Sequence, residues 1–312
     1  MKKNFAKLAM MAAVMMTAGA MMTACSNDLA DEGISENPMT AGEPTEVTLT
    51  FSPYEVTAMG GGDQDAAQTS GSQRASTRAA RRAAVSEFAD RIDIWLYESG
   101  SEVYAAHQYK TDDGFASVAV TLNKTKTYTL YAVAHKGTDV ATLADGVVTF
   151  PGDKVTHSFF YSQTFTPATT TSLSCQMQRI VGMFRVETTD AVPSEVKKVI
   201  IGVSATSTRW NVAGYGENPL ERTLTYNNIN TNDYGQAGFN VYIMAENDEP
   251  INCDITVTAY NASDAVVKAH TFTNVPIRNS YRTTYKGTFF TDQAFSASFT
   301  TADWTDYDET TY

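Results

Sequence analysis

The sequence predicts an all-β protein with two antiparallel β-sandwich domains in tandem. Most apolar segments alternate apolar and polar side chains, which is the period of a half-buried strand. The connections between them are short and rich in Gly, Asn, Asp and Ser, and no long segment has the 3.6-residue period of an amphipathic helix. Thr and Tyr are frequent, whereas charged residues make up only 19% of the chain, a composition that favours strands in a secreted protein.

The first half of the chain contains a regular series of expected strands. Residues 46–51 alternate polar and apolar side chains, with Val47, Leu49 and Phe51 on one face. In residues 91–97, the alternate residues starting at Ile92 share one face and those starting at Arg91 share the other. The further strands expected here are 102–109, 118–122, 127–135, 147–150 and 155–161.

A Thr-rich passage at residues 162–171, containing Pro167, predicts the boundary between the two halves. The strands expected beyond it are 173–177, 179–187, 196–203, 239–245, 253–260, 265–272, 281–290 and 295–299. Between 204 and 238 we expect a loop rich in Gly and Asn. The predicted organisation is a leader at 1–24, a flexible tether at 25–44, an N-terminal sandwich at 45–170 and a C-terminal sandwich at 171–312.

The N-terminus reads as a secretory leader that ends at Cys25. Three lysines precede an uncharged apolar run at residues 8–20, which is too short and wrongly flanked for a membrane-spanning helix. Met22-Thr23-Ala24-Cys25 resembles the lipobox of bacterial lipoproteins, with Met22 in place of the usual Leu. That resemblance implies that Cys25 becomes the lipidated N-terminus, carrying a diacylglycerol and acyl chains such as palmitate, which together anchor stably. Asp28, Asp31 and Glu32 resemble an export signal to the cell surface.

Charge and motif content exclude several function classes. Removal of the leader takes the net charge from −12 to −15, which argues against nucleic-acid binding by phosphate neutralisation. The four His residues have no metal-site spacing, and no HExxH or GxSxG motif occurs, so we expect no metal, no cofactor and no catalytic residues. Cys175 and Cys253 are expected either to pair in an oxidising compartment or to remain free and buried. Trp95, Trp210 and Trp304 are candidate carbohydrate platforms or, more commonly, core anchors.

Residues 57–86 stand apart from the strand pattern. Three consecutive glycines are followed by small polar residues and then by Arg74, Arg78, Arg81 and Arg82, without the apolar pattern of a core element. Long segments of this kind are functional or disordered, and basic residues in them suit a trypsin-like protease. Arg74, Arg78 and Arg82 are therefore candidate processing sites.

Several patterns together resemble the fimbrillin superfamily, the lipoprotein-derived subunits and anchors of type V pili. Besides the lipobox and the Arg-bearing segment, they are the strand 91–97 with its Ser-Gly-Ser turn, residues 178–186 followed by Val192-Pro193, residues 275–287, and the terminal Trp304. The resemblance implies two transthyretin-like β-sandwich domains and a structural role at the outer membrane and cell surface. It also implies assembly with other pilus subunits by β-strand donation.

In that family, shaft subunits lose a first strand by proteolysis after an Arg, whereas anchor subunits stay intact and lipidated; both alternatives remain open here. Val47, Leu49 and Phe51 are the candidate removable or groove-filling strand. Phe295, Ala297 and Phe299, or the acidic tail beside them, are the candidate donor strand. The competing hypothesis is a surface glycan-binding β-sandwich lipoprotein, which neither polymerises nor copurifies with filaments. In either case a host or bacterial surface ligand is an expected partner.

Overall fold

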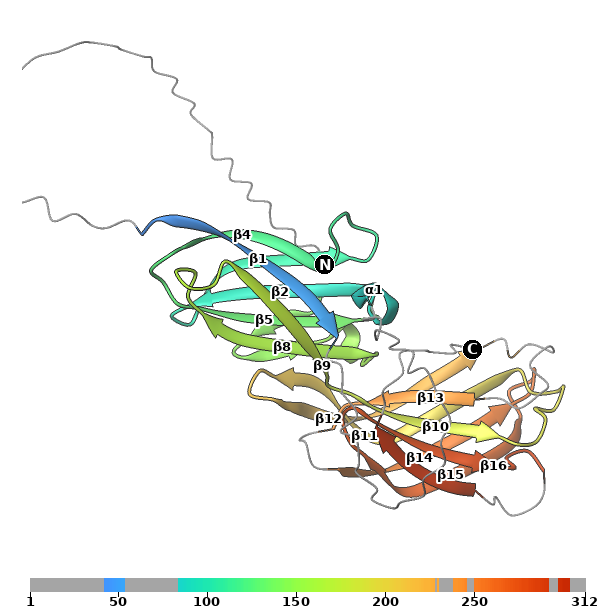
Figure 1. Ribbon diagram of the computed structural model, residues 1–312. Helices are drawn as coiled ribbons and strands as arrows, with labels where there is room; N and C mark the ends of the chain where they lie inside the picture. Colours follow the sequence, from blue (N-terminus) through green and yellow to red (C-terminus); the bar gives the residue numbers. More distant parts are fainter. Residues whose placement is uncertain are drawn as a thin grey trace, which may run out of the picture. The chain divides into compact units, whose positions relative to one another are not determined.

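The computed structural model describes residues 42–53, 84–227, 229, 238–245, 250–291 and 297–303, the last range by its backbone only. Strands dominate these residues, and the helical segments among them are the short helix α1 (Val85–Phe88) and the 3-10 turn η1 (Pro151–Asp153). The predicted all-β sandwich class is confirmed (Figure 1). No helix in the described part of the chain is long and apolar enough to cross a membrane.

The first sandwich consists of two layers that bend out of one continuous sheet. Its strands are β1 (Pro44–Pro53), β2 (Arg91–Glu98), β3 (Ser101–Tyr109), β4 (Ser117–Asn123), β5 (Tyr128–His135), β8 (Ser158–Phe165) and β9 (Ser172–Arg179). The strand order is β3-β2-β5-β8-β9-β1-β4. Apolar side chains from β2, β5 and β8 pack against those of β1, β4 and β9 in one core, so the sheet closes on itself as a sandwich.

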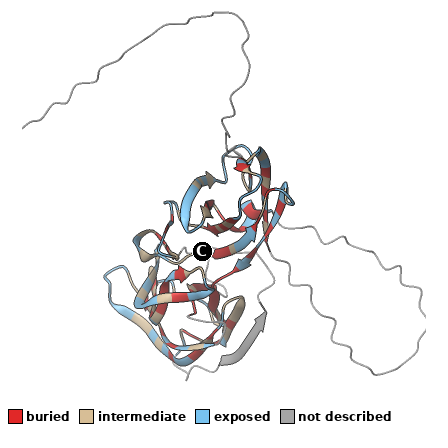
Figure 2. Cartoon of the chain, turned by 90° about the vertical axis from the view of Figure 1, so that its left-hand side faces the viewer, coloured by how far each residue is buried: buried red, intermediate tan, exposed pale blue. Residues whose placement is uncertain are grey.

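The alternation predicted for residues 91–97 is confirmed in β2. Ile92, Ile94 and Leu96 are fully buried in the core of the first sandwich. Trp95, on the other face, is also buried, but in a separate cluster with residues from the second half of the chain. β2 is therefore covered on both faces. Figure 2 colours the chain by burial, with buried residues in red.

β9 follows the Thr-rich passage that predicts the domain boundary, yet it belongs to the sheet of the first sandwich. Its residues Ser172–Met177 pair in parallel with β1, and its end pairs with β8. The Thr-rich passage thus comprises the end of β8 and the turn between β8 and β9. Its Pro and Thr content is typical of a turn as well as of a linker, which is why composition alone places the boundary early.

The second sandwich is built from β10 (Gly182–Thr188), β11 (Lys198–Asn211), β12 (Tyr215–Asn227), β13 (Gly238–Ile243), β14 (Ile251–Tyr260), β15 (Val266–Ile277), β16 (Tyr281–Gly287) and β17 (Ala297–Asp303). One sheet has the order β13-β10-β16-β17; in the other, β15, β14 and β11 are neighbours and β12 pairs with β11. Both sheets contribute to one core, which includes Phe184, Ile201 and Phe272.

The prediction of a loop over residues 204–238 is wrong for most of these residues. β11 continues to Asn211, and β12 pairs with it in antiparallel fashion from Tyr215 to Asn227. β12 is mostly exposed: along much of the strand, exposed residues alternate with half-buried ones. Its sequence therefore lacks the regular apolar residues that mark a buried strand. Sequence reasoning therefore missed an edge strand that is held mainly by backbone pairing.

A short hairpin joins the first half of the chain to the second sandwich. The strands β6 (Thr142–Ala144) and β7 (Val147–Thr149) pair with each other, and β7 pairs with residues 209–211 of β11. Beneath this pairing lies a buried cluster that includes Trp95, Val148, Phe160, Trp210 and Met244. Trp95 and Trp210 are thus core anchors and do not form carbohydrate platforms; Trp304 lies outside the described residues.

Two of the segments that carry the family resemblance contact each other. Gly182 opens β10, and a Cβ atom at this position would lie 2.4 Å from the carbonyl oxygen of Arg278, so only glycine allows this approach. The Ser280 N–H donates to the carbonyl of Val181 at 2.9 Å, and the Ser280 hydroxyl donates to the carbonyl of Arg179 at 3.0 Å. These residues fix the start of the second sandwich against the turn before β16.

Candidate functional site: the first strand and its slot

From Val47 to Pro53, β1 alternates between buried and more exposed residues. Val47 and Leu49 are fully buried and Phe51 is nearly so, all three within the core of the first sandwich. Thr48 and Thr50, between them, point the other way and are partly or fully exposed. The three residues predicted to fill a groove therefore lie together in one core. Figure 1 shows β1 in blue, beside β4 and β9.

β1 is a central strand with hydrogen-bonded neighbours on both sides. It pairs antiparallel with β4 from Pro44 to Thr50 and parallel with β9 from Thr48 to Pro53. The Thr48 N–H also donates to the carbonyl of Thr171 at 3.0 Å, and the Phe51 N–H donates to that of Ala116 at 2.9 Å. Removing β1 would leave two strand edges without partners, and such edges pair readily with another extended chain.

The residues that enclose β1 form an apolar slot. On β4, Val118, Val120 and Leu122 are buried, and on β9 so are Leu173, Cys175 and Met177. Cys175 lies directly opposite Phe51 in the parallel register. Burial raises the pKa of the Cys175 thiol to about 12, so it is protonated and unreactive while β1 is in place.

The segment that follows β1 begins and ends in the same core. Pro53, the last residue of β1, is buried, and the chain is next described at Ala84, directly before the buried Val85 of α1. Phe88 and Ala89 pack into the core with Val85. Arg74, Arg78, Arg81 and Arg82 fall between these two points, outside the described residues, as does Cys25. A cut in this segment would leave β1 joined to the sandwich only by non-covalent contacts.

The candidate donor strand is partly described, as β17. Ala297 and Phe299 lie on β17 and pair antiparallel with Gly287 and Tyr285 of β16, whereas Phe295 lies outside the described residues. In this chain β17 is therefore an edge strand of the sheet β13-β10-β16-β17. The spacing of Phe295, Ala297 and Phe299 matches that of Val47, Leu49 and Phe51, so both sets can face one side of a strand.

Asp190 fixes the chain just before it continues to β17. Its carboxylate accepts hydrogen bonds from three consecutive backbone N–H groups: Phe289 at 2.8 Å, Phe290 at 2.7 Å and Thr291 at 2.9 Å. Phe289 is buried in the core of the second sandwich. The start of the connection to β17 is therefore held by a charge-assisted hydrogen-bond group, which sequence reasoning did not single out.

A buried polar cluster around Asp93 was also missed, although Asp93 was placed on the correct face of its strand. Arg91 Nε and His107 Nδ1 lie 3.0 and 2.9 Å from Asp93 Oδ1, and His135 Nε2 and the Ala141 N–H lie 3.0 and 2.9 Å from Oδ2. The Gly137 N–H donates to His135 Nδ1, so His135 donates through Nε2. The sequence did offer one signal for this cluster: Asp93 is a charged residue inside a predicted strand, within reach of two histidines.

The environment of Asp93 favours its ionised form. Burial alone raises the pKa of this carboxyl, but the hydrogen bonds from His135, Ala141 and Arg91 outweigh burial and hold the pKa below its ordinary value. The Asp93 cluster lacks a nucleophile, and no group of three or more His, Cys, Asp or Glu residues suited to a metal ion occurs in the described ranges. We interpret the cluster as a structural support for the β6–β7 hairpin, which begins one residue after Ala141.

The two cysteines, left either paired or free by the sequence, are free and buried. Cys175 lies in the core of the first sandwich and Cys253 in that of the second. Burial raises the pKa of the Cys253 thiol to about 11, as it raises that of Cys175. Each sandwich thus carries one protected thiol.

A protein-family model described as "Family of unknown function (DUF6562)" matches residues 41–301 of the chain, from just ahead of β1 into β17. No curated protein matches the chain.

Solved structures similar to this one include a candidate adhesin from Bacteroides thetaiotaomicron, with 10% sequence identity and a TM-score of 0.49, covering 85% of this chain and 98% of that chain. The fimbrial anchor protein Mfa2 from Porphyromonas gingivalis has 9% identity and a TM-score of 0.42, with 84% and 98% covered. The tip fimbrial protein Mfa3 from the same organism has 8% identity and a TM-score of 0.40, with 84% and 100% covered.

Proposed function

The chain belongs to the family of unknown function DUF6562, and we propose that it is a lipid-anchored surface protein that serves as a structural subunit or membrane anchor of a type V-like pilus. In this proposal Cys25 carries the lipid, and subunits join when a neighbour's strand replaces β1. The observation that carries the proposal is the position of β1. It is a central strand of the first sandwich, its apolar face fills the core, and the segment behind it contains four arginines.

The energetics of β1 favour an assembly step that depends on a covalent cut. Val47, Leu49 and Phe51 together contribute about 5–9 kcal/mol of apolar burial, at roughly 1.5–3 kcal/mol each. A strand held this firmly, and tethered on its C-terminal side, does not exchange on its own. Cleavage after Arg74, Arg78 or Arg82 would remove that tether and also detach the lipid at Cys25. Release from the membrane and opening of the slot would then be one event.

The two positions in a pilus differ in whether this cut occurs. A cleaved chain becomes a shaft subunit, whose slot accepts a donor strand such as the one containing Phe295, Ala297 and Phe299. An uncleaved chain keeps β1 and its lipid. It then serves as an anchor that donates or accepts a strand at another position in the chain. The chemistry of the slot is the same in both cases, so the processing state decides between them.

Processing is tested by changing Arg74, Arg78, Arg81 and Arg82 to Ala together and measuring the mass of the mature surface protein. A matched control changes Lys124 and Lys126, in the β4–β5 turn, to Ala. If the segment is cut, the four-Arg variant keeps a mature N-terminus at Cys25 and forms no filaments, whereas the Lys variant resembles the wild type. Wild-type protein that itself begins at Cys25 assigns the chain to the anchor position.

The state of the slot is tested with a thiol-reactive probe under native conditions at neutral pH. Cys175 faces β1, and Cys253, in the second sandwich, is an internal control of equal burial. A monomer that has lost β1 should label at Cys175 much faster than at Cys253, and a donor strand should restore protection. Equal protection of both thiols in protein lacking residues 25–82 would contradict the slot model.

Lipidation is tested separately with Cys25→Ser. This variant should incorporate no labelled fatty acid and should fail to reach the outer membrane, while its sandwiches fold normally. Label in the variant at the wild-type level would contradict the assignment of Cys25.

A further inference from the structure

A cavity of about 560 Å³ lies apart from the β1 slot, where two connections of the first half of the chain meet β11, β12 and β13. The connections are the residue that follows β5 and the stretch from η1 to the start of β8. The volume is in the range of small-molecule sites. Its wall is largely apolar, with Val155, Val203, Leu224 and Val241 among the lining residues.

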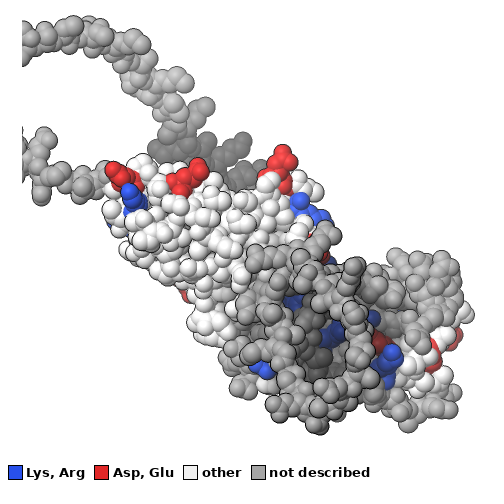
Figure 3. All heavy atoms as spheres, viewed as in Figure 1, with Lys and Arg blue, Asp and Glu red and all other residues white. Residues whose placement is uncertain are grey.

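The charged residues of this cavity are all basic. Lys136, Lys154 and Arg222 line it, and no Asp or Glu is among its described lining residues. In a chain of net charge −12 this composition is a local reversal of sign. Figure 3 shows how sparse charged side chains are on the visible described face of the first sandwich. Cationic side chains in an apolar hollow raise the local concentration of anions.

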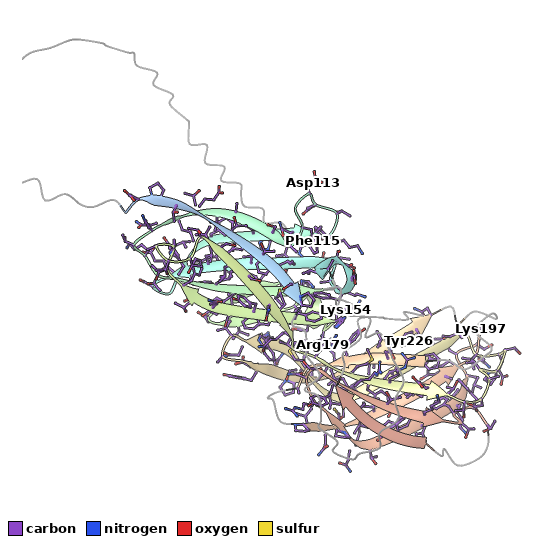
Figure 4. The ribbon with its side chains drawn as sticks, in the orientation of Figure 1. Asp113, Phe115, Lys154, Arg179, Lys197 and Tyr226 are labelled. Carbon is purple, nitrogen blue, oxygen red and sulfur yellow. The ribbon has the colours of Figure 1, made fainter. Side chains whose placement is uncertain are left out.

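Hydrogen bonds across the cavity hold its walls in place. Arg222 Nη2, on β12, donates to the carbonyl oxygens of Gly152, at 3.1 Å, and Asp153, in η1. The Tyr226 hydroxyl accepts from the Asn240 N–H at 3.0 Å and donates to the carbonyl of the same residue, which links β12 to β13. Both contacts of Arg222 are with neutral carbonyls, so its charge is not cancelled by a carboxylate. Lys154 and Tyr226 are labelled in Figure 4.

One wall contains a stacked pair of rings, of which His157 is fully buried and Tyr242 is half-buried. The rings of His157 and Tyr242 stack with centroids 5.4 Å apart and planes within 5° of parallel. Arg179 Nε donates to His157 Nε2 at 2.9 Å, so this nitrogen is an acceptor and the imidazole is neutral. On β12, Arg222, Leu224 and Tyr226 are half-buried on the face toward the cavity, and they alternate with exposed residues on the other face.

We propose that this cavity binds an anionic sugar, a saccharide unit that carries a carboxylate or a sulfate group. The apolar residues and the half-buried rings of Tyr226 and Tyr242 suit the C–H face of a pyranose, and Lys154 and Arg222 suit its acid group. This inference does not depend on strand exchange, because β1 contributes nothing to the cavity. It gives the protein a ligand-binding role in addition to its place in a filament.

The proposal is tested by saturation-transfer NMR on the full chain with four probes: glucuronic acid, glucose 6-sulfate, glucose and a tetra-aspartate peptide. At least one acidic sugar should bind with a dissociation constant in the range of about 1 mM or below, typical of small fragments, and glucose should bind much more weakly. Binding should weaken as salt is raised. Binding of glucuronic acid alone would identify a carboxylate site, and binding of glucose 6-sulfate alone would identify a sulfate site. Binding of both would identify a site that recognises only the negative charge and the sugar ring.

Lys154→Ala is the informative variant, because Lys154 is exposed and, among the described contacts, makes no ion pair that folding depends on. It should reduce the affinity for the acidic sugar about tenfold, the loss expected for one charge-assisted contact. Lys154→Arg should retain binding. Lys197→Ala, which removes a half-buried lysine outside the cavity, should leave binding unchanged. Equal binding of glucose, no binding of either acidic sugar, tighter binding of the peptide than of every sugar, or unchanged affinity in Lys154→Ala would overturn the proposal.

Discussion

The two sandwiches repeat one strand order, and they differ in how their first strand is attached. In the first, β1 lies between an antiparallel partner, β4, and a parallel partner, β9. In the second, β10 lies between an antiparallel partner, β13, and a parallel partner, β16. The opposite layers also correspond, with neighbours β3-β2-β5-β8 in one and β12-β11-β14-β15 in the other. Each half therefore holds its first strand in the middle of a layer.

The attachments of these two strands are not alike. β10 follows β9 after only Ile180 and Val181, so a cut beside it would separate the halves of the chain. β1 is separated from α1 by the segment that contains the four arginines. Under the proposed cleavage, the first strand would become separable in the first sandwich and would stay attached in the second. The proposed strand exchange would therefore use only the first sandwich.

Each sandwich also carries one addition that the other lacks. The first has the β6–β7 hairpin between β5 and β8, and this hairpin pairs with β11 of the second. The second has β17 added beside β16. The shared strand order supplies a core in each sandwich. The β6–β7 hairpin connects the two halves of the chain, and β17 adds the C-terminal strand to the second sandwich.

The largest effects are expected from cutting back the first strand of each sandwich. Leu49→Ala in β1 and Phe184→Ala in β10 should each reduce the free energy of unfolding of the uncleaved chain, by about 2–5 and 3–5 kcal/mol respectively, because both side chains are fully buried. Thr50→Ala, on the exposed side of β1, is the matched control and should change the free energy of unfolding by less than about 0.5 kcal/mol. Urea unfolding, followed by tryptophan fluorescence, measures all three.

The comparison sharpens once the chain has been processed. In assembled filaments of a cleaved subunit, Leu49→Ala should have no effect on filament stability, because β1 is absent, whereas Phe184→Ala should remain destabilising. Equal destabilisation of filaments by both substitutions would show that β1 stays in its slot after assembly.

Alternation made the fold class and the interior faces of β1 and β2 predictable, because one side of each strand meets an apolar core. Val47, Leu49 and Phe51 could be selected for that reason alone. β12 could not, since it is an edge strand whose stability comes from backbone pairing with β11 and leaves little trace in its side chains. The Asp93 cluster, the contacts of Asp190 and the cavity were harder to predict. Two of the four partners of Asp93, His135 and Ala141, are 42 and 48 residues away in the chain, and the three partners of Asp190 are 99–101 residues away. The cavity is lined by separate segments between Lys136 and Tyr242, so only the folded arrangement brings these residues together.

The support of the β6–β7 hairpin, the addition in the first sandwich, can be tested at Asp93. Asp93→Asn should lower the free energy of unfolding by about 3–5 kcal/mol, because it leaves the buried Arg91 without its counter-charge. Asp90→Asn, which breaks the exposed pair with Lys110, is the control and should cost about 0–1 kcal/mol. A cost for Asp93→Asn no larger than that of the control would show that the Asp93 cluster does not support the β6–β7 hairpin.

The pH dependence of the same variant has a definite sign. The pKa of Asp93 is lower in the folded chain than its ordinary value of 3.8, so the unfolded chain binds more protons in acid. The stabilisation by Asp93 is complete above that ordinary value and is lost as the pH falls through the lower folded value. The difference in stability between wild type and Asp93→Asn should therefore be constant near neutrality and shrink below about pH 4.

The addition in the second sandwich can be tested at Asp190, with a smaller expected effect. Asp190→Ala removes the acceptor of three backbone N–H groups and should cost about 1–3 kcal/mol, since the buried Phe289 keeps most of its packing. Asp190→Asn retains one acceptor oxygen and should lose less. Hydrogen exchange measures the consequence directly: the amides of residues 289–291 should exchange faster in Asp190→Ala, followed by those of β16, while those of β1 and β9 in the other sandwich should not change. If β17 is also the strand that leaves its own sheet to fill a neighbour's slot, its earlier release should speed filament assembly. Faster exchange at 289–291 with an unchanged assembly rate would place the donor strand elsewhere in the chain.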